Sequence, residues 1–86
     1  MKKVIYKKDQ HIGQLVVVTE HPETQVYTIA GYGNQDLVIL QWFEGTKLCS
    51  QGHSAYDLVK PTIEQIEYSI ANNGRLVSTD DIVEWA

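Results

Sequence analysis

The stretch at residues 36–43, Asp-Leu-Val-Ile-Leu-Gln-Trp-Phe, is apolar at nearly every position and decides the fold. Side chains alternate between the two faces of an extended chain. One face therefore carries Val38, Leu40 and Trp42. The opposite face carries Leu37, Ile39 and Phe43. A strand that is apolar on both faces needs a cover on each of them, and the rest of the chain must supply these covers.

The length of the chain allows only one folded domain, residues 1–86. An apolar content of 43% with 21% charged residues is ordinary for a folded protein and argues against disorder. A chain of this length buries only about 60–65% of its unfolded surface, so self-association would add stability.

The charge is acidic overall, at −4, but unevenly placed. Lys2, Lys3, Lys7 and Lys8 precede all eleven acidic residues, and only three of the seven basic residues follow them. Nucleic-acid binding needs a broad basic footprint, so this distribution argues against it. The lysines are better explained as charges that protect a first strand from edge pairing.

A single cysteine, Cys49, rules out an internal disulfide and suits a reducing cytoplasm. The charged start of the chain is not followed by an apolar run, so neither a signal peptide nor a membrane span is expected. We therefore expect a cytoplasmic protein that does not enter the membrane.

Period-two patterns predict antiparallel strands over the first half of the chain. The predicted strands are 2–7, 14–19, 25–32, 36–43 and 46–50. Gly33-Asn34 and Glu44-Gly45 are hairpin signals, and the other connections are too short for parallel crossovers. A further return strand is predicted at 75–78.

The period then changes to that of a helix. Val59, Ile63, Ile66 and Ile70 form one apolar stripe. Pro61 suits the first helical turn, and Asn73-Gly74 supplies a stop. Ser54 can cap an earlier turn over 54–60, and Thr79-Asp80-Asp81 predicts a short terminal turn.

Together these elements predict an α+β fold, an antiparallel meander of about five or six strands with one C-terminal helix packed on one face and a short terminal turn. The second face of the sheet then has two possible covers. Either a second copy of the protein covers it, or the sheet curls into a half-barrel and closes on itself.

Three constellations carry possible chemistry. Cys49 and His53 have the residue types of a nucleophile and its base, but spacing alone is weak evidence for catalysis. The same pair with His11 or His21, completed by Glu20 and Glu23 beside His21, could bind zinc. One Cys and three scattered His do not supply the two close-spaced ligand pairs of a structural site, so no metal or other cofactor is expected. The Gly-x-Gly at residues 31–33 leads into a strand and is better explained by a hairpin than by phosphate binding.

Two further groups have structural explanations. Asp80, Asp81 and Glu84 lie where carboxylates stabilise a helix start. The aromatic side chains of the strands fit burial in a core or a subunit contact better than base stacking, because the strands that carry Tyr27, Tyr32 and Trp42 contain no lysine or arginine.

The sequence resembles no family that these residues allow us to name, and it favours a non-enzymatic interaction or accessory protein that forms a homodimer or binds another protein. The expected interface is the apolar sheet face, with Val38, Leu40, Trp42, Tyr27 and Ile29. The alternative is a small-molecule binding module in which Tyr27, Tyr32 and Trp42 line a pocket of a curled sheet.

Overall fold

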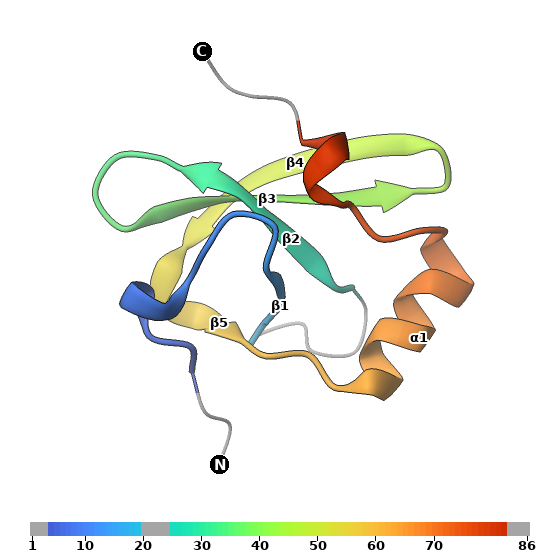
Figure 1. Ribbon diagram of the computed structural model, residues 1–86, viewed down its shortest axis with the longest axis horizontal. Coiled ribbons are helices and arrows are strands. Elements are labelled where there is room, and N and C mark those ends of the chain that lie inside the picture. Colours follow the sequence, from blue (N-terminus) through green and yellow to red (C-terminus); the bar gives the residue numbers. More distant parts are fainter. Residues whose placement is uncertain (1–3, 20–24, 83–86) are drawn as a thin grey trace.

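The computed structural model describes residues 4–19 and 25–82, which form a curled antiparallel sheet with one α-helix beside it (Figure 1). The strands are β1 (Leu15–Val18), β2 (Tyr27–Tyr32), β3 (Leu37–Glu44), β4 (Lys47–Ser54) and β5 (Leu58–Val59). Their order in the sheet is β4-β3-β2-β1-β5, and every neighbouring pair is antiparallel. The predicted α+β meander with a C-terminal helix is confirmed.

Three short 3-10 turns complete the described elements. They are η1 (Lys7–Asp9), η2 (Ala55–Asp57) and η3 (Thr79–Asp81). The side chain of Ser54 accepts a hydrogen bond from the Tyr56 N–H, so the predicted cap at Ser54 is confirmed for a turn that is shorter than expected. The predicted terminal turn is η3.

Two predicted strands are not formed. Within the described part of 2–7, Val4 makes an isolated bridge to Val59, and the chain then turns into η1. Residues 75–78 form no strand of the sheet. The pairing position beside β1 is taken instead by β5, which residue periodicity cannot reveal because it spans only Leu58 and Val59.

Both hairpins lie where the turn signals predict them. In the β2–β3 turn the Gly33 N–H donates to the Leu37 carbonyl at 2.8 Å, and Gln35 takes the left-handed conformation with φ of 58°. In the β3–β4 turn Gly45 has φ of 67°, a conformation that L side chains avoid. Beyond this turn β3 and β4 stay in register over eight residue pairs.

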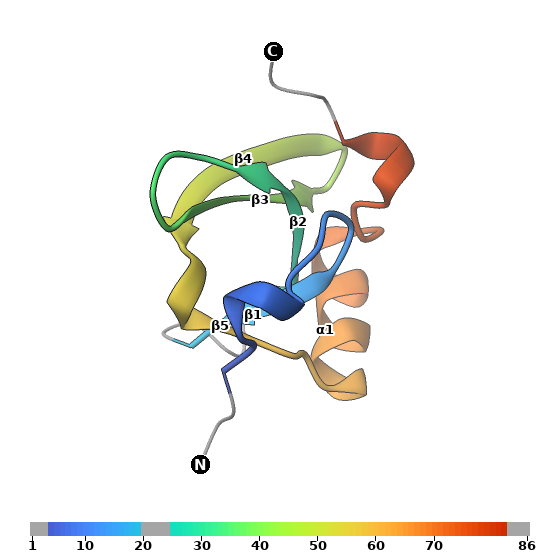
Figure 2. The same ribbon diagram turned by 60° about the vertical axis from the view of Figure 1, so that its left-hand side comes forward.

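The sheet curls round so that one of its faces encloses the core. The buried cluster contains Val16, Val18, Ile29, Val38, Leu40, Ala55 and Leu58. The cluster joins residues of β3 to residues of β5 and η2, although β5 lies at the opposite edge of the sheet from β4. Figure 2 shows the sheet curling round the core. A register shift between Ile29 and Gly31 marks a bulge in β2, which increases the local bend. The first face of β3 is thus covered from within the chain, as the curled-sheet alternative requires.

The opposite face is covered by the segment that follows the helix. Thr28 and Gln41 are buried there, and the Thr28 hydroxyl donates to the Val77 carbonyl at 2.8 Å. The Arg75 guanidinium lies 4.4 Å from the centroid of the Phe43 ring, a cation–π contact. On this second face Gln41 and Phe43 are buried whereas Leu37 is 41% exposed, so the cover lies over the C-terminal half of β3.

Helix α1 (Ile63–Asn73) begins at a capping box and ends at a glycine. Thr62 and Gln65 form a capping box, in which Gln65 N–H donates to Thr62 Oγ1 at 3.1 Å. Gly74, with φ of 93°, ends the helix as predicted. Pro61 lies just before the cap rather than in the first turn. No helix within residues 4–19 and 25–82 has the length and apolar character that a membrane crossing requires.

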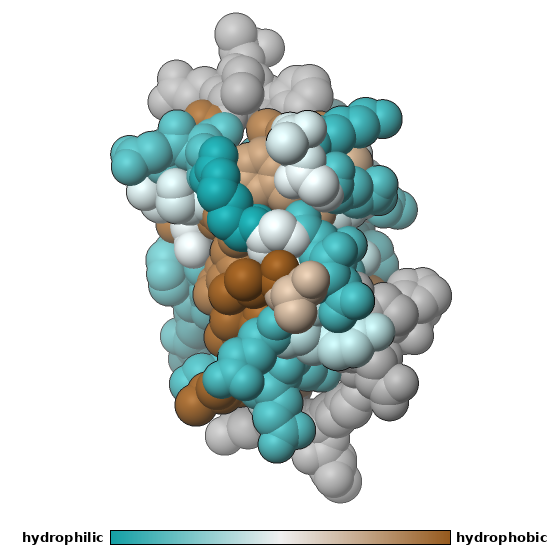
Figure 3. All heavy atoms as spheres, turned by 90° about the vertical axis from the view of Figure 1, so that its right-hand side faces the viewer, coloured by the Kyte–Doolittle hydropathy of each residue, from teal (hydrophilic) through white to brown (hydrophobic). Residues whose placement is uncertain are grey.

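The predicted apolar stripe is only partly covered, since Val59 and Ile66 are half-buried while the other two residues are exposed. Ile63 is 74% exposed and Ile70 46% exposed, whereas Ser69 is buried. Ser69 Oγ accepts hydrogen bonds from Gln25 Nε2 at 3.0 Å and from the Val26 N–H, so a polar contact holds the helix to the start of β2. Figure 3 shows the resulting apolar surface on the side of the molecule where α1 lies, bordered by hydrophilic residues.

Candidate functional site

The two edges of the sheet differ, and the β5 edge is covered. It is two residues long, and the N-terminal segment lies along it. The Ile5 N–H donates to the Leu58 carbonyl at 2.8 Å, and Val4 bridges to Val59. Pro61, which has no N–H to offer, follows two residues later. Another chain finds little backbone to pair with at this edge.

The β4 edge is long and open. The Ala55 N–H donates to the Asp36 carbonyl at 2.7 Å, which fixes the alternation of bonded pairs along the β3–β4 ladder. The backbone groups that form hydrogen bonds to β3 are therefore those of Lys47, Cys49, Gln51 and His53. The backbone N–H and C=O groups of Leu48, Ser50 and Gly52 point away from it. Within the described ranges these outward groups have no backbone partner outside the ladder.

The side chains of β4 leave this edge accessible. Ser50, Gln51 and Gly52 are exposed, and two of the three have small side chains or none. Soluble proteins usually protect an edge with a lysine, a proline or a bulge. Here the one lysine, Lys47, stands at the first position, and the register runs without a shift to Ser54.

Three of the five residues predicted to form an apolar interface are buried inside the single chain. Val38 and Ile29 are 0% exposed and Leu40 is 2% exposed. The expectation that this sheet face is a free surface is therefore wrong at these positions. The physical reason is the curl of the sheet, which brings β5 and η2 over the face and leaves no area there for a second copy.

The other two predicted interface residues, Tyr27 and Trp42, are half-buried. Their rings meet edge to face with centroids 5.0 Å apart, and Trp42 Nε1 donates to Glu44 Oε1 at 3.4 Å. Burial, and secondarily the charge of Glu44, raises the pKa of the Tyr27 hydroxyl. Trp42 is the cross-strand partner of Cys49, so this pair lies one strand in from the open edge.

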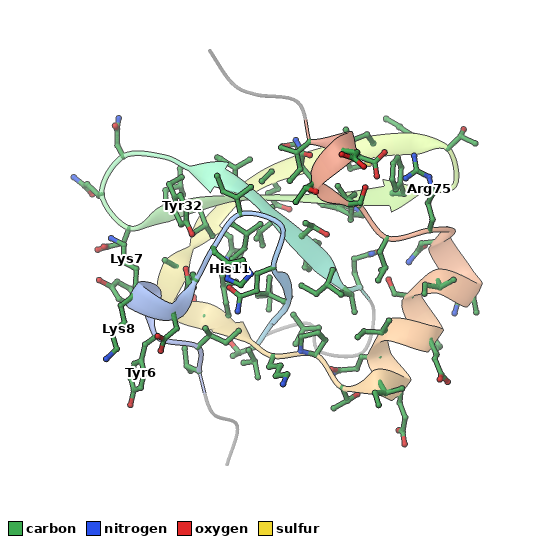
Figure 4. The ribbon with its side chains drawn as sticks, viewed as in Figure 1. Tyr6, Lys7, Lys8, His11, Tyr32 and Arg75 are labelled. Carbon is green, nitrogen blue, oxygen red and sulfur yellow. The ribbon has the colours of Figure 1, made fainter. Side chains whose placement is uncertain are left out.

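The predicted aromatic pocket is not assembled. Tyr27 and Tyr32 stand at opposite ends of β2, five residues apart, which is about 16 Å along a strand. Tyr32 is 47% exposed, and Figure 4 shows it near the edge of the molecule that also carries Lys7. Of the three predicted pocket residues, only Trp42 and Tyr27 are in contact, and the three side chains do not converge on a ligand.

The Cys49 and His53 side chains are likewise kept apart. Both belong to β4 instead of a strand-to-helix junction, and four residues along a strand span about 13 Å. The Cys49 thiol lies 3.9 Å from the Lys47 carbonyl, and His53 Nδ1 lies 3.4 Å from the Ser54 carbonyl. The thiol and the imidazole cannot exchange a proton directly.

The acidic residues near the C-terminus have a structural role where the structure describes them. Asp81 accepts a hydrogen bond from the Ser78 N–H at 2.9 Å and pairs with Arg75. The Arg75 guanidinium, followed by the Ser78 N–H, lowers the pKa of the Asp81 carboxyl. Asp80 is exposed, and Glu84 lies outside the described residues.

No metal site is found where the structure gives coordinates. Residues 4–19 and 25–82 contain no group of three or more His, Cys, Asp or Glu side chains that could hold an ion. The predicted scattered set falls partly outside these ranges, since Glu20, His21 and Glu23 are among the residues not described.

The basic N-terminal cluster is partly neutralised. Lys7 Nζ lies 2.7 Å from Asp36 Oδ1, and the hydroxyl of Tyr56 also hydrogen-bonds to this carboxylate. The hydrogen bond from Lys7, then that from Tyr56, lowers the pKa of Asp36. Figure 4 shows Lys7 and Lys8 at one end of the molecule and Arg75 at the other, so they form no continuous basic strip. Lys2 and Lys3 lie outside the described residues.

Comparisons of this chain with models of protein families, with curated proteins and with solved structures found no match. The candidate site therefore rests on geometry. Sequence reasoning located part of the open edge, because 46–50 was predicted as a strand. It missed residues 51–54, whose Ser, Gln, Gly and His carry little strand propensity.

Proposed function

We propose that the protein is a small non-enzymatic interaction protein that forms a homodimer by antiparallel pairing of β4 with β4 of a second copy. The observation that carries the proposal is the eight-residue edge, whose outward N–H and C=O groups have no cover among the described residues. Another extended protein segment could add to the same edge. A second copy is favoured because two identical antiparallel edges are complementary by symmetry.

The expected affinity is modest. Each backbone hydrogen bond contributes a net of about 0.5–1.5 kcal/mol, whereas association costs about 4–15 kcal/mol. Pairing of one strand edge therefore roughly offsets the cost of association and leaves little surplus. The surplus comes from side chains that flank the edge, among which Leu48, Cys49 and Trp42 are half-buried in the single chain. Such a dimer dissociates on dilution.

This proposal keeps the self-association expected from the sequence and moves it from the sheet face to the sheet edge. Trp42 remains in the proposed contact, whereas Val38, Leu40 and Ile29 belong to the core. The proposed compartment is the cytoplasm, which the single free cysteine, Cys49, supports.

Light scattering on a gel-filtered sample tests the proposal with one pair of variants. The native protein is expected to approach twice the chain mass of 9.8 kDa at high concentration and to fall toward 9.8 kDa on dilution. Ser50→Pro removes an outward N–H while leaving the β3–β4 ladder bonds in place, and it should raise the dimer dissociation constant by about tenfold or more. Ser50→Ala keeps that N–H and should dimerise as the native protein does.

Two results would contradict the proposal. The first is a mass of 9.8 kDa at every concentration up to about 1 mM, because a dimer that is still absent there has a binding free energy weaker than about 4 kcal/mol. The second is a native dimer that Ser50→Pro leaves unchanged, which would place the contact on another surface, such as the exposed face of α1 with Ile63 and Ile70.

A further inference from the structure

An open groove lies between the turn that precedes β1 and the start of α1. Its volume is about 420 Å³, within the range of small-molecule sites. The residues that line it are His11, Gln14, Leu15, Lys60, Pro61 and Ile66. Figure 2 shows the link from β5 passing below the turn before β1 on its way to α1. The groove is distinct from the β4 edge and from the predicted aromatic pocket.

Both walls of the groove are held in place by hydrogen bonds. In the turn, the His11 N–H donates to Gln14 Oε1 at 3.0 Å, and the Gln14 N–H donates to the His11 carbonyl at 3.1 Å. The Gly13 N–H donates to the Ile29 carbonyl at 2.8 Å, which ties the turn to β2. On the other wall, the capping box at Thr62 fixes where α1 begins. The groove is therefore formed before any ligand arrives.

The lining divides into a polar and an apolar half. His11, Gln14 and Lys60 carry N–H donors, while Leu15, Pro61 and Ile66 are apolar. Among the residues that the structure describes, no carboxylate lines the groove, although the chain as a whole carries a net charge of −4. In the described part of the chain Lys60 has no ion pair. Gln14 uses its side-chain oxygen within the turn, which leaves its amide N–H groups to donate.

We propose that this groove binds a small organic anion, a carboxylate that carries an apolar group. The carboxylate accepts hydrogen bonds from Lys60 and from the His11 and Gln14 side chains, because charged acceptors form the stronger bonds. The apolar group lies against Leu15, Pro61 and Ile66, where its burial is favourable. This binding does not depend on the proposed dimer, since the lining contains no residue of β4.

Octanoate is the probe, and amide NMR spectra of the full chain are the readout. Octanoate is expected to shift the amide signals around residues 11–15 and 60–66 in a saturable way, with a dissociation constant of about 1 mM or below. Octanamide, which matches it in length but lacks the charge, and acetate, which lacks the apolar chain, should each bind about threefold or more weakly. Comparison of the three probes separates the contribution of the polar half of the groove from that of the apolar half.

A pair of lysine variants tests the role of charge. Lys60→Gln should weaken octanoate binding about two- to fivefold, the upper part of the range for an exposed charge pair, with otherwise unchanged spectra. Lys8→Gln removes an exposed charge outside the groove and should leave binding unchanged. The proposal is overturned if octanoate causes no saturable shift in these segments at about 10 mM. Equal binding of octanamide, equal binding of acetate, or an unchanged constant in Lys60→Gln would also overturn it.

Discussion

The two edges of the sheet differ in length and in whether another segment covers them. The β5 edge is two residues long, lies under the N-terminal segment and is followed by Pro61. The β4 edge is eight residues long, keeps an unbroken register with β3 and ends beside η2 without a covering segment among the described residues. One edge is closed by the chain itself, and the other presents backbone groups that no described segment of the chain pairs.

The comparison shows that side chains and backbone stabilise these edges differently. Leu58 on β5 is 0% exposed and belongs to the core cluster. On β4, the residues with outward backbone groups include Ser50 and Gly52, which bury no apolar side chain. Changes at β5 should therefore alter the free energy of unfolding, whereas changes at β4 should alter self-association.

The largest expected effect is at the closed edge. Leu58→Ala leaves a cavity in the core cluster and should lower the free energy of unfolding by about 2–5 kcal/mol. Leu48→Ala on β4 is the matched control, because Leu48 is half-buried, and it should cost about 1 kcal/mol. Urea denaturation of both variants measures the difference. Equal losses would contradict the assignment of the core to the β5 side.

A proline pair tests the alternation of backbone groups along β4. Gln51→Pro removes an N–H that bonds to β3 and leaves a carbonyl unpaired, so it should cost about 1–3 kcal/mol of unfolding free energy. Ser50→Pro removes only an outward N–H, and its cost should be smaller, under about 1 kcal/mol. Thermal or urea unfolding at a concentration where the protein is monomeric gives both values. The reverse order would mean that the outward and inward residues are assigned the wrong way round.

The smallest expected effect is a pH dependence of the segment that covers β5. Lys7 and Tyr56 lower the pKa of Asp36 below its usual value of 3.8. A carboxyl whose pKa is lowered by folding stabilises the protein above its unfolded value, and this contribution is lost as the pH falls through the folded value. Acidification below 3.8 should therefore loosen the N-terminal cover.

A carbon-detected NMR titration of the Asp36 carboxyl measures this directly. The midpoint should lie below 3.8, and the amide signal of Ile5 should follow the same curve. In Asp36→Asn the Ile5 amide should lose this transition, because the titrating group is gone. A midpoint at or above 3.8 would show that the contact to Lys7 does not hold in solution.

The sequence predicts the elements well where local signals are strong. The hairpin turns at Gly33-Asn34 and Glu44-Gly45, the stop at Gly74 and the cap at Ser54 each follow from one or two residues. The two-faced pattern of residues 36–43 also correctly indicates that both faces of β3 need a cover. What it cannot show is which segments provide these covers, because β5 and residues 75–82 have no regular period.

The helix stripe shows why amphipathic patterns can mislead about packing. Ile63 and Ile70 lie on a face that the sequence predicts to be buried, yet both are exposed. The contact to the sheet is made by Ser69, whose hydroxyl binds Gln25 and the Val26 N–H. A network of polar partners distant in sequence has no periodic signature, so it is visible only in three dimensions. The candidate site, the open β4 edge, could not be predicted from the sequence for a similar reason. Which strand lies at the edge depends on the order of strands in the sheet, and this order has no periodic signature either.

Amide hydrogen exchange along β4 tests the central claim most directly. At a concentration where the dimer forms, the outward amides of Leu48, Ser50 and Gly52 should be protected nearly as well as the inward amides of Cys49, Gln51 and His53. On dilution the outward amides alone should lose protection, while the inward amides keep theirs. If the outward amides exchange freely at every concentration, the β4 edge remains unpaired and the proposed dimer is wrong.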